Sequence, residues 1–436
     1  MDHLEQNGLA ARRDLAVRAA VEQGLVTDDR QPLAALLDET AVRDAARALH
    51  AAFRAVAAPG QPVLHTFAVK AASLVPVLRL LAEEDVGCEV ASPGELALAR
   101  AAGVSSAHTV LDSPAKTRAE LREALDLGVA LNADNPQELS RLDALVGASP
   151  SSAPLGLRVN PQLGGGSIDA MSTATEHSKF GVALRDPGAR EWVVRAYLER
   201  PWLTRLHTHT GSQGCPPELM AEGVRAAYAL AEEVNAAVGR QQIDTLDIGG
   251  GLPVDFASDE GGPSYEGYAR LLARTVPGLF DGRYGLVTEF GRSLTAKAGT
   301  VLARVEYAKS AGGRAIAVTH AGAQVAARTV FAPEAWPLRV AAYDAKGRAK
   351  EGPAVVQDVA GPCCFAGDLV ARERPLPLLE EGDYAALLDT GAYYASNPFG
   401  YNSLPRPGVY AYDSDLRFTT IRHPQSVEDL VAESGG

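Results

Sequence analysis

Lys70 ends a short apolar run, His65 to Val69, that has the composition of a buried strand. An ammonium group at such a place must be solvated, paired or bound covalently, because an unpartnered buried charge is costly or loses its proton. A neutral lysine in a pocket is a nucleophile toward aldehydes. The bland alternative is a lysine that marks where a strand meets solvent, since most lysines stay exposed.

A run of three glycines, Gly249–Gly251 in LDIGGGLP, follows another strand-like segment. Glycine leaves amide N–H groups unobstructed, so such a backbone turn can hold a phosphate. It can also be no more than a tight turn, and the dinucleotide spacing GxGxxG is absent. Ser212 in HTHTGSQ and the pair Gly291 and Arg292 in EFGR end neighbouring strand-like runs and could complete an anion site.

Imidazole and carboxylate groups accompany the lysine and the glycines. His207 and His209 lie at the end of one strand-like run, and Glu289 lies near the end of another. Together these groups meet the needs of pyridoxal 5′-phosphate: Lys70 can form a Schiff base with its aldehyde, and the glycine turn can hold its phosphate. His209 can stack on the ring, and Glu289 can keep the ring nitrogen protonated. We therefore predict a site for this cofactor.

Eight short apolar runs, separated by segments of helical periodicity, position these groups. The runs are residues 65–69, 87–92, 108–113, 128–133, 156–161, 205–210, 245–250 and 286–291. This alternation predicts a (β/α)8 TIM barrel, whose chemistry gathers at the C-terminal ends of the strands. The first and eighth strands of a closed barrel are neighbours, so Lys70 and Glu289 are expected on adjoining strands.

The pattern changes after residue 300 to strand-like runs separated by Gly, Pro and Asp. We predict an α/β chain in three parts. Residues 1–40 form an N-terminal segment in which QPLAALLDE adds a strand to the second domain, residues 41–305 form the cofactor-binding barrel, and residues 306–436 form an all-β barrel or sandwich.

Composition limits the partners of this chain. Its 436 residues are 46% hydrophobic, enough for one large and one smaller core, and its net charge of −13 disfavours nucleic acids and anionic membranes. A small-molecule substrate is expected. The N-terminus lacks the apolar core of a signal peptide, and no apolar run reaches the ~18 residues of a membrane span, so we expect a cytoplasmic protein. The four cysteines show neither zinc nor disulfide spacing.

The order of the motifs resembles the fold-type III pyridoxal-phosphate decarboxylases, the family of diaminopimelate and ornithine decarboxylases. The matching segments are HTFAVKAAS, GCEVASPGEL, SKFG, HTHTGSQ, LDIGGGLP, EFGR, GPCCFAGD and DTGAYY. The resemblance covers residues 30 to 415, nearly the whole chain. It implies an alanine-racemase-like architecture, α-decarboxylation of an amino acid, and a head-to-tail homodimer with shared active sites.

Carried onto this chain, the resemblance implies two catalytic residues, Lys70 and Cys364. Lys70 would form the Schiff base, a quinonoid intermediate would follow loss of carbon dioxide, and the partner subunit's Cys364 would protonate Cα. The implied cofactor-binding residues are Lys70, Glu95, Arg158, His209, Ser212, Gly249, Gly250, Gly251, Glu289, Gly291, Arg292 and Tyr393. The implied substrate-binding residues are Arg292, Arg328, Phe365 and Tyr393. Glu95 and Arg158 could equally belong to structural ion pairs, and no metal site is predicted.

Departures from the family concern the far end of the substrate pocket. Diaminopimelate and ornithine decarboxylases carry an acidic residue after the cysteine, which receives the distal ammonium, whereas this chain has Phe365. The missing charge-assisted hydrogen bond is worth on the order of 1.5–3 kcal/mol, although cation–π contact offsets part of it. Arg328 matches the arginine for a distal carboxylate, but the expected tyrosine four residues later is Ala332. We infer a substrate with an apolar, bulky or carboxylate-bearing tail and without the usual terminal ammonium.

Other functions stay open at this point. Diaminopimelate decarboxylation proper and amino-acid racemisation use the same fold and cofactor, although family alanine racemases have an arginine where Glu289 stands. From another class, His207 and His209 could bind a divalent metal as in amidohydrolases. That pair lies on the first strand there and would lie on the sixth here. A non-catalytic cofactor carrier fits poorly because the chain has the second domain with Cys364 and Tyr393.

Overall fold

The computed structural model describes residues 8–27, 30–149, 151–260 and 262–436. The chain forms two compact units. The barrel unit comprises Arg43–Val254 and Gly261–Leu294, and the sheet unit comprises Met1–Val42, Asp255–Glu260 and Thr295–Gly436. Residues 1–7 of the predicted N-terminal segment lie outside the described residues.

The barrel unit is built on a closed ring of parallel strands. The strands are β2 (Val63–Ala68), β3 (Gly87–Val90), β4 (Thr109–Leu111), β5 (Ala130–Ala133), β6 (Leu155–Asn160), β8 (Leu203–His207), β9 (Thr245–Asp247) and β10 (Gly285–Phe290). Each pairs with the next, and β10 pairs with β2, which closes the ring. The short strand β7 (Val182–Ala183) pairs with β6 outside the ring. The predicted barrel is therefore confirmed, including the adjoining positions of its first and eighth strands.

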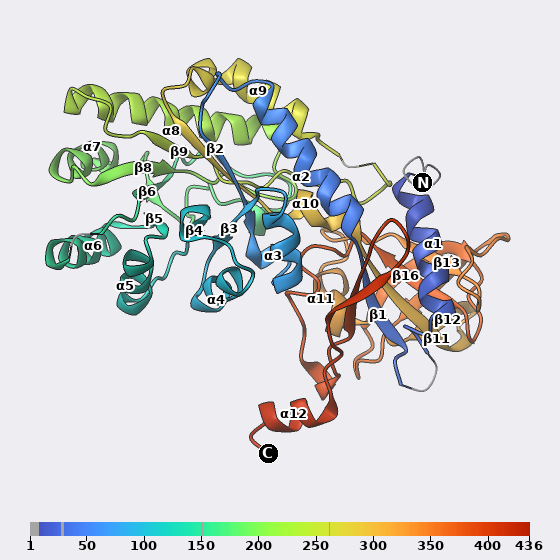
Figure 1. Cartoon of the computed structure of the whole chain (residues 1–436). Helices are drawn as coiled ribbons and strands as arrows, with labels where there is room; N and C mark the ends of the chain where they lie inside the picture. Colours follow the sequence, from blue (N-terminus) through green and yellow to red (C-terminus); the bar gives the residue numbers. More distant parts are fainter. Residues whose placement is uncertain (1–7, 28–29, 150, 261) are drawn as a thin grey trace. The chain divides into compact units, whose positions relative to one another are not determined.

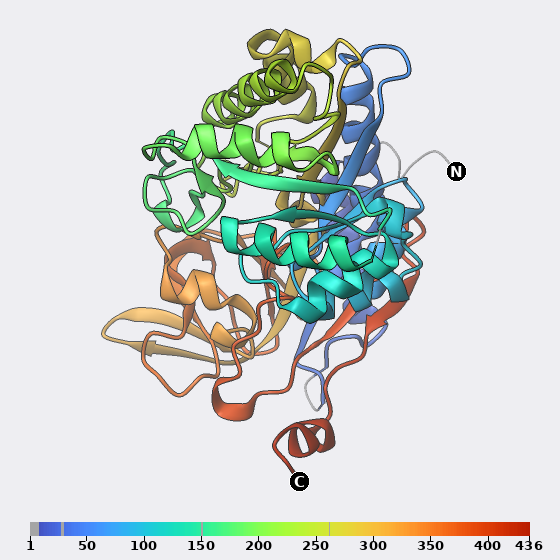
Figure 2. The ribbon, with the colours of Figure 1, turned by 90° about the vertical axis from the view of Figure 1, so that its left-hand side faces the viewer.

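Helices cover the outside of the barrel strands, as Figure 1 shows for α4 to α7 around β3 to β8. The helices are α2 (Glu39–Arg54), α3 (Val75–Ala82), α4 (Pro93–Ala101), α5 (Arg118–Leu127), α6 (Pro136–Ala148), α7 (Ala189–Glu199), α8 (Pro217–Val238), α9 (Tyr265–Thr275) and α10 (Arg292–Thr295). Figure 2, turned by 90°, shows the teal to yellow-green helices side by side in front of the strands. Because helices cover one face and side chains fill the interior, β3, β4, β5 and β6 are buried at every position. This double burial explains why the sequence shows continuous apolar runs rather than alternation.

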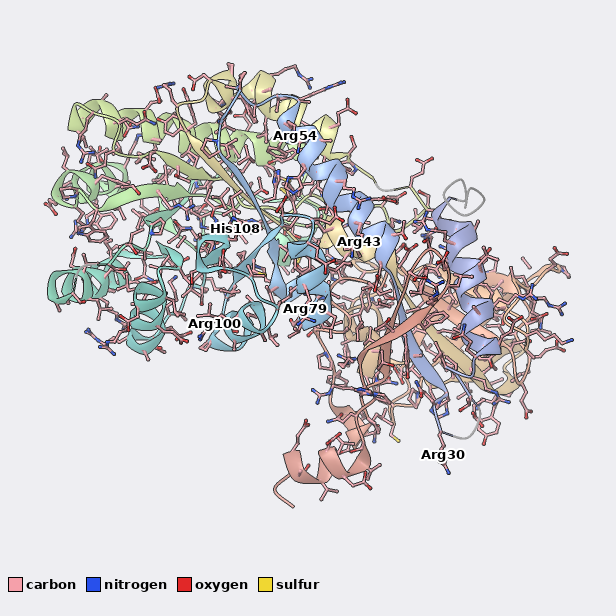
Figure 3. All side chains as sticks on the ribbon, in the orientation of Figure 1. Arg30, Arg43, Arg54, Arg79, Arg100 and His108 are labelled. Carbon is pink, nitrogen blue, oxygen red and sulfur yellow. The ribbon has the colours of Figure 1, made fainter. Side chains whose placement is uncertain are left out.

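Local sequence sets where the outer helices begin and how they are joined. Ser92 and Asn135 accept the backbone N–H three residues into α4 and α6, as helix-capping residues do. Two of the arginines labelled in Figure 3, Arg43 and Arg100, link consecutive helices. Arg43 on α2 bonds to Glu83 and Glu84 after α3, and Arg100 on α4 lies 3.7 Å from Glu123 on α5.

The sheet unit contains a nine-stranded mixed sheet. Its strands are β1 (Leu33–Asp38), β11 (Gly299–Ala311), β12 (Arg314–Thr319), β13 (Val340–Tyr343), β14 (Ala354–Ala360), β15 (Leu369–Pro377), β16 (Tyr384–Leu388), β17 (Gly408–Tyr412) and β18 (Phe418–Arg422). Strand β1 pairs with β11 and β17, far from it in sequence. Alternate residues of β11 enter different apolar clusters, Val301 and Val305 in one and Leu302 in the other, so both faces of the sheet are covered.

The predicted sheet-rich second domain is confirmed, and it also carries three helices that the sequence pattern did not reveal. They are α1 (Leu9–Glu22), α11 (Ala323–Phe331) and α12 (Val427–Glu433). Helix α1 packs Ala16, Val17 and Ala20 into one of the two apolar clusters, so it covers a sheet face. Among the described residues, we find no helix that is both long and apolar enough to cross a lipid bilayer.

Candidate active site

Lys70 lies in a single 3₁₀ turn, Val69–Ala71, directly after β2 and therefore at the C-terminal end of the barrel. Its Nζ donates to the carboxylate of Glu89 on β3, and the pairing of β2 with β3 places Ala68 opposite Glu89. The Lys70 side chain is 46% exposed, whereas that of Glu89 is 2% exposed. Burial raises the pKa of Glu89, and the Lys70 ammonium opposes this rise. A buried carboxylate thus holds a lysine that a ligand can still reach.

His209 follows β8 and is fixed by the glycine run. The N–H of Gly250 donates to His209 Nδ1 over 3.1 Å, so the proton of a neutral imidazole lies on Nε2. Burial lowers the pKa of His209 well below its usual value, and the charges of Arg158 and Lys70 lower it further. His209 is therefore a neutral ring held in one orientation.

The glycine run is needed because three loops approach one another closely. A Cβ on Gly250 would lie 1.9 Å from the carbonyl oxygen of Glu289, and one on Gly251 would lie 1.8 Å from the carbonyl oxygen of Gly211. The same position on Gly251 would be 3.3 Å from Cα of Ser212. The loops after β8, β9 and β10 therefore meet, and they bring Ser212 beside the glycine run.

Only part of the predicted phosphate cradle has amides that face outward to a ligand. The N–H of Gly249 donates to Asp247 Oδ1 over 3.1 Å, and that of Gly250 donates to His209. The N–H of Gly251 has no acceptor within the described part of the chain. Gly249 and Gly250 thus shape the turn, and Gly251 is the one that offers its amide.

Glu289 on β10 belongs to a fully buried cluster with Asp112, His207 and Asp247, in which one side-chain O or N atom from each residue lies within 4.8 Å of the others. His207 Nδ1 lies 3.4 Å from Asp112 Oδ1, and His207 Nε2 lies 3.6 Å from Glu289 Oε2. His209 Nδ1 is 4.0 Å from the same oxygen of Glu289. The imidazole of His207 therefore contacts a carboxyl group through each of its nitrogen atoms.

Burial and mutual repulsion shift the protonation of this cluster. Burial raises the pKa of Glu289 to about 7, although the nearby His207 opposes the rise. Burial, followed by repulsion from Glu289, raises the pKa of Asp247 to about 8. For His207, burial lowers the pKa, but the charges of Asp112 and Glu289 outweigh it and raise the pKa well above its usual value. The cluster thus combines a cationic imidazole and an ionised Asp112 with two carboxyl groups, Glu289 and Asp247, whose pKa values are raised.

Arg158 and Glu95 have different partners. Arg158 Nη1 on β6 lies 3.9 Å from Asp134 Oδ1, and its guanidinium lies 4.4 Å from the ring centroid of Phe180 in the SKFG segment. Glu95 on α4 accepts the N–H of Ala91 over 2.7 Å. Glu95 therefore fixes the start of α4, while Arg158 is held beside a second carboxylate at the strand ends.

Arg328 and Tyr393 lie together in the sheet unit. The guanidinium carbon of Arg328 is 4.7 Å from the ring centroid of Tyr393 and 5.0 Å from that of Trp336. Its Nη1 is buried and has no hydrogen-bond partner among the described residues. A cation held between two rings in this way keeps its hydrogen-bonding capacity for an anion.

Cys364 and Phe365 lie in the sheet unit after β14. Cys364 is exposed, and its N–H donates to Asn402 Oδ1 over 2.8 Å. Phe365 stacks on Phe331 with 5.5 Å between ring centroids and meets the edge of Tyr401 at 5.9 Å. Phe331 is 58% exposed and Tyr401 is 43% exposed. We call Phe331, Phe365, Phe399 and Tyr401 the aromatic cluster.

Two members of the buried cluster, Asp112 and Asp247, are not among the residues predicted from the sequence. Asp112 follows β4, and Asp247 is the last residue of β9. Both lie at the C-terminal ends of barrel strands, where barrel enzymes carry their catalytic groups. The strand-end position that pointed to Lys70 and Glu289 therefore pointed to these two residues as well. What no strand pattern could supply is that both face His207.

Comparison with known proteins gives one consistent family. The family model "Pyridoxal-dependent decarboxylase, pyridoxal binding domain" matches residues 42–296. Diaminopimelate decarboxylase of Haemophilus influenzae is 31% identical over 374 residues, covering 85% of this chain and 87% of that protein. The enzyme of the same name from Methanothermobacter thermautotrophicus is 32% identical over 405 residues, covering 91% and 90%.

Solved structures agree with this match. Diaminopimelate decarboxylase from Helicobacter pylori, complexed with L-lysine, superposes with a TM-score of 0.81 and 25% identity, covering 94% of this chain and 98% of that one. Lysine/ornithine decarboxylase from Vibrio vulnificus, complexed with putrescine, has a TM-score of 0.74 and 23% identity, covering 93% and 99%. The second likeness concerns the fold alone.

Proposed function

Since the chain belongs to the pyridoxal-dependent decarboxylases and uses pyridoxal 5′-phosphate, we propose that it removes the α-carboxylate of an amino acid whose side chain ends in a second carboxylate. The observation that carries this choice of substrate is Arg328, whose buried Nη1 has no hydrogen-bond partner among the described residues. An unsatisfied buried guanidinium is costly, and a substrate carboxylate would satisfy it.

The residues at the barrel mouth fit the cofactor. When bound, it supplies an aldehyde for a lysine and a ring that accepts electrons from Cα. Lys70 is the covalent anchor, and its Nζ passes its proton to Glu89 when it reacts. The neutral imidazole of His209 would lie against the ring, and the Gly251 amide, with Ser212, Gly291 and Arg292, would hold the phosphate.

Glu289 would accept the N–H of the protonated ring nitrogen. Its Oε1 is buried and has no hydrogen-bond partner among the described residues, while Oε2 faces His207 and His209. A carboxylate with one oxygen engaged and the other free is suited to accept one N–H. Arg158 is held at the strand ends by its contact with Asp134.

The surroundings of Phe365 support a substrate tail without a distal ammonium. Phe365 contacts the rings of Phe331 and Tyr401, and no carboxylate accompanies it in these contacts. An amino acid of the length of diaminopimelate that lacks its second amine, 2-aminopimelate, combines a carboxylate for Arg328 with an uncharged stem for the aromatic cluster.

Diaminopimelate decarboxylation is the second candidate, because the curated relatives bear that name. Release of carbon dioxide from both enantiomers of 2-aminopimelate and from meso-diaminopimelate separates the two, since one enantiomer differs from diaminopimelate only in the distal amine, whichever centre reacts. We expect kcat/KM to be about tenfold or more higher for 2-aminopimelate, given the 1.5–3 kcal/mol that an unpaired ammonium forfeits. A preference of that size for diaminopimelate would select the second candidate.

Two variants test the shared part of the proposal. Purified protein should acquire a visible absorption band with the cofactor, and Lys70→Ala should lose this band and all carbon dioxide release while keeping its circular dichroism. A wild-type protein that stays colourless would contradict the proposal. Arg328→Met should raise KM for both dicarboxylic substrates and leave the cofactor band unchanged.

We further propose a homodimer in which the partner subunit's Cys364 protonates Cα. Its exposed thiol and the exposed aromatic rings beside it support a face covered by a second copy of the chain. Mixing the inactive variants Lys70→Ala and Cys364→Ala should restore about a quarter of wild-type activity, because half of randomly exchanged dimers are hybrids with one intact site of two. No recovery after subunit exchange would show that Cys364 does not act across subunits.

A further inference from the structure

His207 presents a nitrogen atom to a carboxylate on each side. Nδ1 lies 3.4 Å from Asp112 Oδ1, and Nε2 lies 3.6 Å from Glu289 Oε2. All three side chains are at most 5% exposed. A neutral imidazole has one N–H and one lone pair, so it would turn a lone pair toward one of the two carboxylates. When both carboxyl groups are ionised, only the doubly protonated ring matches both neighbours.

Asp112 is itself held from its other side. Asn132 on β5 donates through Nδ2 to Asp112 Oδ2 over 3.1 Å. This bond leaves Oδ1 directed at His207. Asp112 is therefore an oriented acceptor for His207, and its carboxyl group also interacts directly with that of Glu289.

Other charged groups face the same ring. Asp247 on β9 adds an attraction to the His207 cation, and its strand position is opposite His207 in the β8–β9 register. Arg205 on β8, Asp134 after β5 and His209 after β8 also interact electrostatically with members of the cluster. Burial raises the pKa of Asp112, but the charge of His207, hydrogen bonds with His207 and Glu289 and the charge of Lys116 together outweigh it and lower the pKa. Asp112 is nevertheless the partner that lies nearest to a nitrogen atom of His207.

We propose that Asp112 is a positioning residue of the catalytic site, which keeps His207 doubly protonated and thereby keeps Glu289 anionic toward the ring nitrogen of the cofactor. This inference rests on the role proposed above for Glu289. None of the three groups, Asp112, His207 and Glu289, gives up a proton during turnover. Asp112 holds the charge on His207, and the cation on His207 holds the charge on Glu289.

Removing the charge of Asp112 has two opposite effects on Glu289. Loss of a neighbouring negative charge favours the ionised carboxylate, whereas loss of the proton from His207 favours the protonated one. For Glu289, His207 is a larger influence than Asp112. The second effect therefore wins, and Asp112→Asn should leave Glu289 protonated and unable to accept the N–H of the ring.

The protonation state of His207 can be measured in the protein without cofactor. In a ¹H–¹⁵N titration with His207 assigned through His207→Gln, the wild-type ring should carry both protons at neutral pH. In Asp112→Asn the midpoint should fall by about 1–3 pH units, the effect of one opposite charge at this distance. Asp112→Glu, which keeps the charge, should restore part of the shift. A wild-type His207 that is neutral at pH 7, or an unchanged midpoint in Asp112→Asn, would overturn the proposal.

The loaded enzyme gives a second readout. Asp112→Asn should lower kcat about tenfold or more while KM stays within about twofold, since one pKa unit is a factor of ten in the population of the ionised carboxylate. The pH at which the absorption spectrum of the bound cofactor changes should shift in the same variant. Asp281→Asn, an outer carboxylate paired with Arg283, should change neither. A loss of folding stability without these shifts would reduce Asp112 to a structural residue.

Elemental analysis covers the competing explanation. Asp112, His207, Asp247 and Glu289 could also surround a divalent cation. A stoichiometric metal in the wild-type protein that is lost in Asp112→Asn would refute the proposal. The two proposals can fail independently. The titration of His207 needs no cofactor and tests only the role of Asp112, whereas the absorption band that depends on Lys70 tests the proposed function and does not require Asp112.

Discussion

Asp247→Asn tests whether the buried cluster holds a proton on a carboxyl group. In the folded protein burial raises the pKa of Asp247 to about 8, against an ordinary 3.8. Between pH 5 and pH 7 the folded protein then binds one proton that the unfolded chain has released. Stability from a raised pKa is present at low pH and lost as pH rises, at about 1.4 kcal/mol per pH unit. Over two units, the wild-type protein loses about 2.7 kcal/mol through this group.

The asparagine variant has no proton to lose, and its amide oxygen can still accept the N–H of Gly249 that now bonds to Asp247 Oδ1. Urea unfolding of both proteins at pH 5 and pH 7 should therefore show the variant gaining about 2.7 kcal/mol relative to wild type at the higher pH. Asp281→Asn is the control. Burial would raise the pKa of Asp281, but hydrogen bonds from Arg283 lower it, so its ionisation does not change in this range. An equal difference between wild type and Asp247→Asn at the two pH values would mean that Asp247 is ionised in the fold.

Three further predictions follow from particular contacts. Gly250→Ala should cost about 1–3 kcal/mol of unfolding free energy and weaken cofactor binding in a fluorescence titration, because its Cβ meets a main-chain oxygen at 1.9 Å; Gly147→Ala, with open space around it, should do neither. Lys116→Met should cost about 3–5 kcal/mol in urea unfolding, because it strands the buried carboxylate of Glu138, now 2.8 Å from the ammonium. Phe365→Glu should raise kcat/KM for diaminopimelate over 2-aminopimelate about tenfold or more by restoring an acidic partner; an unchanged ratio would place this side chain away from the substrate tail.

The barrel could be predicted because its signal is local and repeated. Strands buried on both faces leave continuous apolar runs, and some of the helices between them begin at a capping residue, as α4 does at Ser92 and α6 at Asn135. Strand order then follows from the fold, which is why Lys70 and Glu289 were expected on adjoining strands, and they are. The helix α11 escaped prediction because its alanines lie in a segment flanked by strand signals.

The partners of the site residues could not be predicted in the same way. The family resemblance implied that Glu95 and Arg158 both organise the cofactor site, yet Glu95 fixes the start of a helix and Arg158 lies on Phe180. The amides of Gly249 and Gly250 were expected to face a ligand, but they bond to Asp247 and His209. Such pairings depend on side-chain directions across strands that are far apart in sequence.

The buried cluster lowers the stability of the fold, and this loss of stability is the best indication that the cluster has a function. Three carboxyl groups and one imidazole lie in a water-poor interior, where Asp247 Oδ2 and both nitrogen atoms of His207 have no hydrogen-bond partner among the described residues. A stability-driven core would replace them with apolar side chains of similar volume, which often costs nothing or stabilises. Their persistence at the end of the barrel where Lys70 lies is explained if the charge on Glu289 must be controlled. The hydrogen bond from Asn132 then also helps to control the charge on Glu289, because it orients Asp112, whose carboxylate stabilises the cation on His207.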